Sequence, residues 1–100
     1  MKAGRPTMYT RDDVLDAALA VARHVGYLRM TREHVAVQAG CSPAQVSHLL
    51  GTMVQLRRQV MRAAVKKRDL VVIAQGLVAR DSHAQVADEG LRREALGAML

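Results

Sequence analysis

Apolar residues recur three and four positions apart along most of the chain, which is the spacing of a buried helix face. The first such stripe follows Thr10, a residue type that caps helices. Gly26 stands after the stripe and is expected to end the helix. The pattern therefore predicts a helix between these two residues. Its apolar positions are Val14, Leu15, Ala18, Leu19, Ala22 and Val25.

Two short helices joined by a tight turn are predicted in the middle of the chain, near 31–39 and 43–50. Thr31 can cap the first, and Gly40 can adopt the positive φ that ends a helix with little strain. Ser42 can cap the second, and a proline follows it at the first helical position, where a missing N–H has no consequence. This arrangement is typical of a helix-turn-helix, which in many proteins reads duplex DNA.

A capping box of Thr52 with Gln55 predicts that a fourth helix begins at Met53 and ends near 68–70. One side of this helix is apolar and the other is basic, with positive residues at steps of four. The apolar side holds Leu56, Val60, Ala63 and Ala64, and the basic side holds Arg58, Arg62 and Lys66.

The last third of the chain continues the helical pattern. Asp69 can cap a helix over 70–79, which is apolar almost all round and should therefore be buried. Ser82 with Gln85 offers another capping box, and Gly90 can interrupt the final segment. We therefore predict an all-α fold, a compact bundle of about five to six helices that contains a helix-turn-helix.

Composition supports this fold class. The 100 residues suffice for one small domain, and they include no Phe or Trp and only two Tyr. Ala, Val and Leu dominate, which favours closely packed helices over a β-sandwich.

The net charge of +6 is unevenly distributed. Residues 1–68 hold twelve Lys or Arg and four Asp or Glu, whereas residues 69–100 hold three and five. Positive charge thus accompanies the predicted helix-turn-helix, as phosphate binding requires. We predict a flexible basic arm over 1–9, a DNA-binding region over 10–68, and C-terminal helices for dimerisation over 69–100.

Other classes of protein are disfavoured. The single Cys41 excludes an internal disulfide framework, and the four His lack metal-ligand spacing. No paired carboxylates, phosphate-binding glycine loop or nucleophile motif indicates an enzyme. The N-terminus does not resemble a signal peptide, and apolar runs such as 70–74 are too short to span a bilayer. We expect a cytoplasmic protein with no cofactor, metal, membrane or small-molecule partner.

The helix near 43–50 supplies the candidate base contacts. Winding it as a helix turns Val46, Leu49 and Leu50 toward the protein, and the opposite side outward. Gln can pair bidentately with adenine, His can bond to bases, and Ala can contact a thymine methyl group. We therefore expect base contacts from Ala44, Gln45 and His48.

Phosphate contacts are expected from residues beside the helix N-termini and from nearby arginines, because free N–H groups and the helix dipole attract anions. The two basic residues of the arm, Lys2 and Arg5, can enter a neighbouring minor groove. The candidate phosphate contacts are Arg29, Thr31, Arg32, Ser42, Ser47, Thr52, Arg57 and Arg58.

A dimer is expected because one recognition helix covers few base pairs, whereas two helices a turn of DNA apart multiply specificity. The C-terminal helices have more apolar surface than a monomer readily hides, so we predict that they form a two-fold interface. The residues predicted there are Leu70, Val71, Ile73, Leu77, Leu91 and Leu96.

From Thr10 to Leu56 the chain resembles the DNA-binding domain of TetR-type repressors. The resemblance is carried by an Ala-rich first helix ending in Gly26-Tyr27, by Thr31 opening the second helix, by the turn Ala39-Gly40-x-Ser42, and by Leu56. It implies homodimers on palindromic operators. Three positions depart from the family pattern, so its roles are not carried onto them. Ser47 stands where a phosphate-binding Tyr is usual, Leu50 where an aromatic is common, and Met53 where a Lys is usual.

With 100 residues, we expect the large ligand-binding domain of that family to be missing. From Gly51 onward, the segments GTMVQLRRQVMRAAVKK and VIAQGLVARDSHA look more like small plasmid-borne repressors of the KorC type. That similarity spans nearly the whole chain and implies a repressor of plasmid maintenance or transfer genes, without a small-molecule inducer.

Two alternatives stay open. An activator would use the same helix on DNA and contact polymerase through its acidic C-terminal end. An interaction module, such as an antitoxin or anti-repressor, would bind a protein partner without the strong salt dependence of DNA binding.

Overall fold

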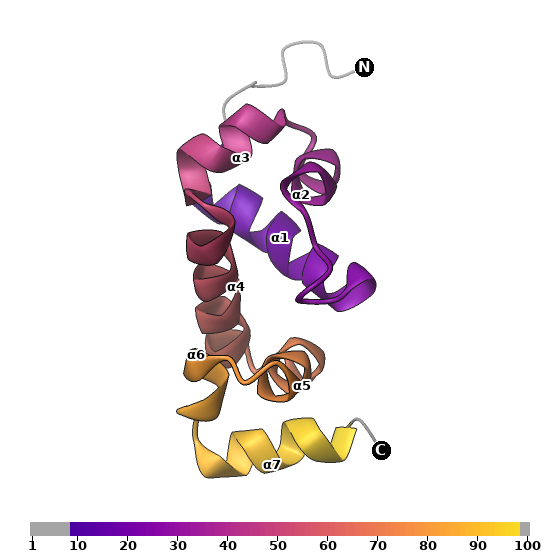
Figure 1. The fold of residues 1–100 in the computed structure, drawn as a ribbon, viewed down its shortest axis with the longest axis vertical. Coiled ribbons are helices and arrows are strands. Elements are labelled where there is room, and N and C mark those ends of the chain that lie inside the picture. Colours follow the sequence, from indigo (N-terminus) through magenta and orange to yellow (C-terminus); the bar gives the residue numbers. More distant parts are fainter. Residues whose placement is uncertain (1–8, 99–100) are drawn as a thin grey trace.

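The computed structural model describes residues 9–98, which form helices and contain no strand (Figure 1). This confirms the all-α prediction, with more helices than the five to six expected. The seven helices are α1 (Arg11–Val25), α2 (Arg32–Ala39), α3 (Pro43–Leu50), α4 (Met53–Lys67), α5 (Leu70–Val78), α6 (Ser82–Gln85) and α7 (Glu89–Ala98).

The first five helices begin where the sequence predicts. At each start a side-chain oxygen accepts a hydrogen bond from a backbone N–H that has no partner within the helix. α2 adds a variation, because the third helical residue is His34, whose Nδ1 accepts from the backbone N of Thr31 at 3.0 Å. The N-cap residues are Thr10, Thr31, Ser42, Thr52 and Asp69.

Two predictions for the last third of the chain are wrong. Ser82 does not cap a helix, because Asp81 Oδ1 accepts from the backbone N of His83 at 2.9 Å and Ala84 at 3.2 Å, which makes Ser82 the first residue of α6. Gly90 does not interrupt the final segment but lies in the first turn of α7. That turn is held by packing of α7 on α5, which outweighs the weak helix propensity of one glycine.

The helices are arranged along one long axis (Figure 1). α4 runs along this axis, with α3 near one end of the molecule and α7 at the other. α1 packs against α2 and α4, while α7 packs against α5. The molecule measures 46 × 26 × 19 Å, so its two ends are well separated.

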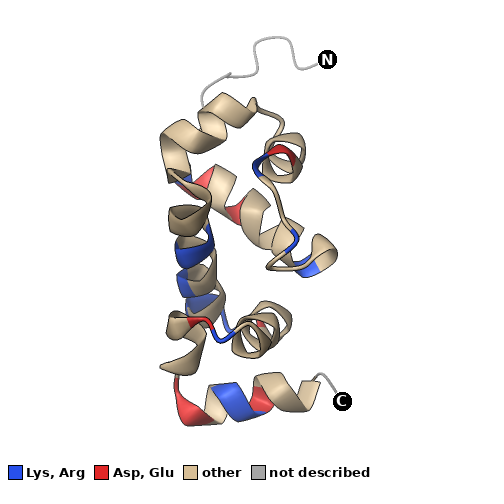
Figure 2. Ribbon diagram, viewed as in Figure 1, with Lys and Arg blue, Asp and Glu red and all other residues tan. Residues whose placement is uncertain are grey.

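Charge follows the helices unevenly (Figure 2). α3 carries no Lys, Arg, Asp or Glu, whereas α4 carries five basic residues and no acidic one. The uncharged helix therefore lies directly before the most basic one.

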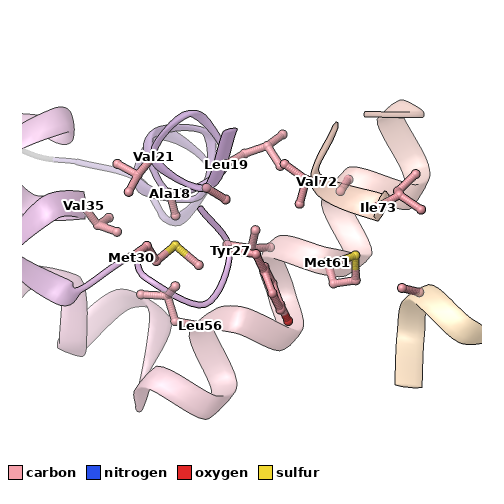
Figure 3. Close-up of a cluster of buried hydrophobic side chains, with 14 of the residues drawn as sticks. Ala18, Leu19, Val21, Tyr27, Met30, Val35, Leu56, Met61, Val72 and Ile73 are labelled. Carbon is pink, nitrogen blue, oxygen red and sulfur yellow. The ribbon is translucent and has the colours of Figure 1, made fainter. Parts of the chain in front are cut away.

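One hydrophobic core joins the helices (Figure 3). The apolar stripes predicted for α1 and α4 supply much of it, including Val14, Leu56 and Val60, each 0% exposed. Tyr27, Met30 and Met61 are also buried, although no periodic pattern marked them. α5 is less buried than expected, because it packs one face inward and leaves Val71 43% and Val78 66% exposed.

Tyr9 is the one residue of the predicted arm that the structure describes. The hydroxyl of Tyr9 donates to the carbonyl oxygen of Gly40 at 2.6 Å, which ties the chain before α1 to the turn between α2 and α3. Lys2 and Arg5 lie outside the described residues. Within the described residues, every helix is too short or too polar to cross a membrane.

Candidate nucleic-acid interface

α2 and α3 meet in a tight turn at one end of the molecule (Figure 1). Gly40 has φ 78°, and its N–H and that of Cys41 both donate to the carbonyl oxygen of Ala36, at 2.8 and 3.0 Å. The Ser42 hydroxyl oxygen then accepts from the backbone N of Gln45 at 3.1 Å and begins α3. The turn is thus fixed by one left-handed residue and one cap, as predicted.

α3 turns its apolar side inward and its polar side outward. Val46 is 0% and Leu50 2% exposed, whereas Ala44 and His48 are exposed. Gln45 lies between the two sides and is half-buried. The three candidate base-contacting residues therefore share one helix, and two of them are on its exposed side.

Gln59 of α4 holds the end of α3 in place. Its Nε2 donates to the carbonyl oxygen of Leu50 at 2.8 Å and to that of Gln55 at 3.0 Å, and its Oε1 accepts from Arg11. Leu50 O is one of the terminal carbonyls that a helix leaves without an internal partner. No sequence signal indicated this contact, because its partners are separated along the chain and have ordinary polar side chains.

Most of the candidate phosphate-binding groups are accessible. Thr31, Ser42 and Thr52 are exposed caps, and each hydroxyl oxygen accepts one backbone hydrogen bond while its own hydrogen stays free to donate. Arg29 and Arg58 are exposed as well, and Ser47 is half-buried. Arg32 is partly buried, and its Nε has no hydrogen-bond partner among the described residues.

Arg57 is less accessible than the exposed groups among these and already makes contacts within the chain. Its guanidinium donates to the carbonyl oxygens of Tyr27, Leu28 and Met30 at 3.4, 3.5 and 3.4 Å. It therefore holds the loop between α1 and α2 against α4. The neighbouring Arg58 points elsewhere because successive residues of a helix face different directions.

The residues predicted for the dimer interface differ in their exposure. Ile73 is 0% and Leu91 3% exposed, because α7 packs on α5 within the same chain. Within this chain these two side chains are therefore core residues. Leu70 and Leu77 are partly buried, while Val71 and Leu96 are 43% and 46% exposed.

Reactive and metal-binding groups are sparse in the described part of the chain. Residues 9–98 contain no group of three or more His, Cys, Asp or Glu placed to hold a metal ion. Burial raises the pKa of the Cys41 thiol above its ordinary value, which disfavours the reactive thiolate.

Comparisons with protein-family models, with curated proteins and with solved structures found no match to this chain. Its function is therefore inferred from the exposed side of α3 and from the basic residues around that helix.

Proposed function

We propose that this protein is a sequence-specific DNA-binding transcriptional repressor that binds a palindromic operator as a homodimer. α2 and α3 would form a helix-turn-helix, with α3 lying in the major groove. The observation that carries the proposal is the exposed, uncharged side of α3 at one end of the molecule, beside helix caps and arginines. Small residues at the start of α3 let its backbone approach base edges closely.

Each candidate side chain has a role in the proposed complex with DNA. Gln45 pairs with adenine, His48 donates or accepts at a base edge, and Ala44 contacts a thymine methyl group. The caps and arginines hold the sugar-phosphate backbone and so fix the register without reading sequence. This set contains Arg29, Thr31, Arg32, Ser42, Ser47, Thr52 and Arg58, with Lys2 and Arg5 as minor-groove contacts.

The proposed dimer packs its subunits side by side. Two recognition helices on successive major grooves lie about 34 Å apart. An end-to-end dimer through α7 would separate the two α3 helices by far more, because α3 and α7 lie at opposite ends of a 46 Å molecule. The exposed Val71 and Leu96, with the partly buried Leu70 and Leu77, are the groups we assign to the interface. Repression follows when the bound dimer occludes a promoter.

Selection of duplexes from a random-sequence library tests the proposal. We expect one palindromic sequence to be enriched, and its affinity to fall roughly 10³-fold or more between 50 and 200 mM salt if six or more phosphates are contacted. Gln45→Ala and His48→Ala should each weaken the selected duplex by about 1–3 kcal/mol while changing random duplex little. Gln38→Ala, an exposed glutamine of α2, is the matched control.

Three results would contradict the proposal. They are the absence of any enriched sequence, an equal loss on selected and random duplex for both α3 variants, and binding that is insensitive to salt. The last result would favour an interaction module with a protein partner. A promoter-reporter assay on the selected sequence separates repression from activation.

A further inference from the structure

We propose that a hollow beside the end of α3 seats one phosphate of the DNA backbone; this inference rests on the proposed function. The hollow has a volume of about 380 Å³ and lies between α1, the end of α3 and the first half of α4. Three arginines line it, and no carboxylate does. We call it the arginine hollow and define it by Arg11, Arg58 and Arg62, with Leu49, Gly51 and Gln59 among its other lining residues.

The arginines come from two helices and are partly held in place. Arg11, in the first turn of α1, donates to Gln59 Oε1 through Nη2, and Arg62 donates from Nε to His83 Nε2 at 3.2 Å. A guanidinium has five N–H donors, so each of these arginines keeps several for an anion. Guanidinium groups bind phosphate oxygens in bidentate pairs, which gives geometric fit as well as charge.

The arrangement is unfavourable without an anion. Arg58, Arg62 and Lys66 follow one another at steps of four on α4, and like charges at that spacing repel within a helix. α4 contains no acidic residue that could offset them. A phosphate between Arg58 and Arg62 relieves this repulsion.

An adjoining hollow shows why the phosphate belongs beside α3. That larger hollow, of about 600 Å³, shares Arg11, Gln59 and Arg62 with the arginine hollow but is also lined by Asp12 and Asp16. Lys67 Nζ lies 2.7 Å from Asp16 Oδ1, so part of the positive charge there is already paired. An anion is therefore favoured in the arginine hollow, where no carboxylate competes.

The positions of the basic residues along α4 also favour a phosphate in the arginine hollow. At 1.5 Å per residue, Arg58 lies about 8 Å and Arg62 about 14 Å from the start of α4, whereas Lys66 lies about 20 Å away. The backbone of a duplex bound to α3 would reach Arg58 and Arg62 but not Lys66. Lys66 is exposed and lies outside the arginine hollow, which makes it a matched control.

The test is the salt dependence of duplex binding by Arg11→Gln, Arg62→Gln and Lys66→Gln. The probes are the duplex selected by the wild-type protein and a random duplex of the same length. Each arginine variant should reduce the magnitude of the slope of log affinity against log salt by roughly 1.8, the value for two phosphate contacts, because each subunit of the dimer loses one. Affinity should fall by a similar factor on both duplexes, because a backbone contact carries no sequence information. Lys66→Gln should leave the slope unchanged.

The outcomes separate this inference from the proposed function. If the wild-type protein binds selected duplex and the arginine variants keep its slope, the arginine hollow holds no phosphate. If Lys66→Gln lowers the slope as much as they do, the attraction to α4 is diffuse and the assignment is wrong. If the wild-type protein binds no duplex, the proposed function fails first and this inference fails with it. Binding to vesicles of anionic lipid instead, lost in the arginine variants, would assign the hollow to a membrane.

Discussion

The buried residue Tyr27 joins the loop after α1 to α4, to α5 and to the cap of α6. Its hydroxyl donates to Asp81 Oδ2 at 2.6 Å and lies 3.1 Å from the carbonyl oxygen of Arg57, and its backbone N donates to Gln75 Oε1 at 2.7 Å. Asp81 also caps α6 through its other oxygen. Tyr27 therefore connects the half of the molecule that contains α3 to the half that contains α5 and α6.

We expect Tyr27→Phe to lower the free energy of unfolding by about 1–3 kcal/mol, because it leaves a partly buried carboxylate oxygen without its donor. Tyr9→Phe is the control, since it also removes one hydroxyl bond but from an exposed site, and we expect roughly 1 kcal/mol or less. Urea unfolding followed by circular dichroism measures both. Equal losses in the two variants would contradict the role of Tyr27.

The same hydroxyl makes stability depend on pH. Burial, and then the hydrogen bond to Asp81 and its negative charge, raise the pKa of Tyr27 well above its ordinary value of 10.0. The unfolded chain therefore loses this proton first, so the stabilisation is complete below about pH 10 and declines as pH rises further, by at most about 1.4 kcal/mol per pH unit. We expect the wild-type protein to lose stability more steeply than Tyr27→Phe between about pH 9.5 and 11. Parallel profiles would show that the phenol proton is not involved.

At the scale of helices, Gly76 lets α5 approach α4 and α6 closely. A Cβ placed there would overlap the end of the buried Met61 side chain and lie 3.1 Å from the Cβ of Ala84. Gly97 in α7 has no such neighbour, since nothing lies within 4 Å of an added Cβ. The two glycines occupy the same kind of local structure and differ in packing.

We expect opposite effects from the same substitution at these two glycines. Gly76→Ala should destabilise the protein by about 1–2 kcal/mol, because overpacking exceeds the gain of roughly 1 kcal/mol in helix propensity. Gly97→Ala should stabilise it by roughly 0.5 kcal/mol, since only propensity changes. Thermal unfolding of both variants and of the wild-type protein shows whether each substitution stabilises or destabilises the fold. A stabilising Gly76→Ala would mean that Met61 moves aside without loss.

At the scale of the whole molecule, the proposed dimer depends on the apolar groups that α5 and α7 leave exposed. Val71→Glu should weaken dimerisation at least tenfold, because it places a charge in an apolar interface. Val37→Glu is the control, because Val37 is 83% exposed on α2, away from α5 and α7. Sedimentation equilibrium at micromolar concentrations measures both, and small-angle scattering measures the length of the dimer. A wild-type monomer, or a dimer about twice 46 Å long, would contradict side-by-side packing.

Local residue patterns were enough to predict the fold class and the start of five helices. Thr10, Thr31 and Ser42 cap as predicted because a cap is a bond between residues three positions apart, so it needs no knowledge of the rest of the fold. The exposed side of α3 followed from periodicity for the same reason.

Which groups meet across the chain depends on how the helices pack against one another. α5 is apolar almost all round, so its pattern could not choose the face that α7 covers, and the structure places Ile73 in the core. Arg57 and Arg58 have the same chemistry, yet packing turns one to the carbonyls of a loop and the other into the arginine hollow. Arg11 meets Gln59 across 48 positions. Such contacts depend on the positions and angles at which helices cross, and no local pattern of residues encodes them.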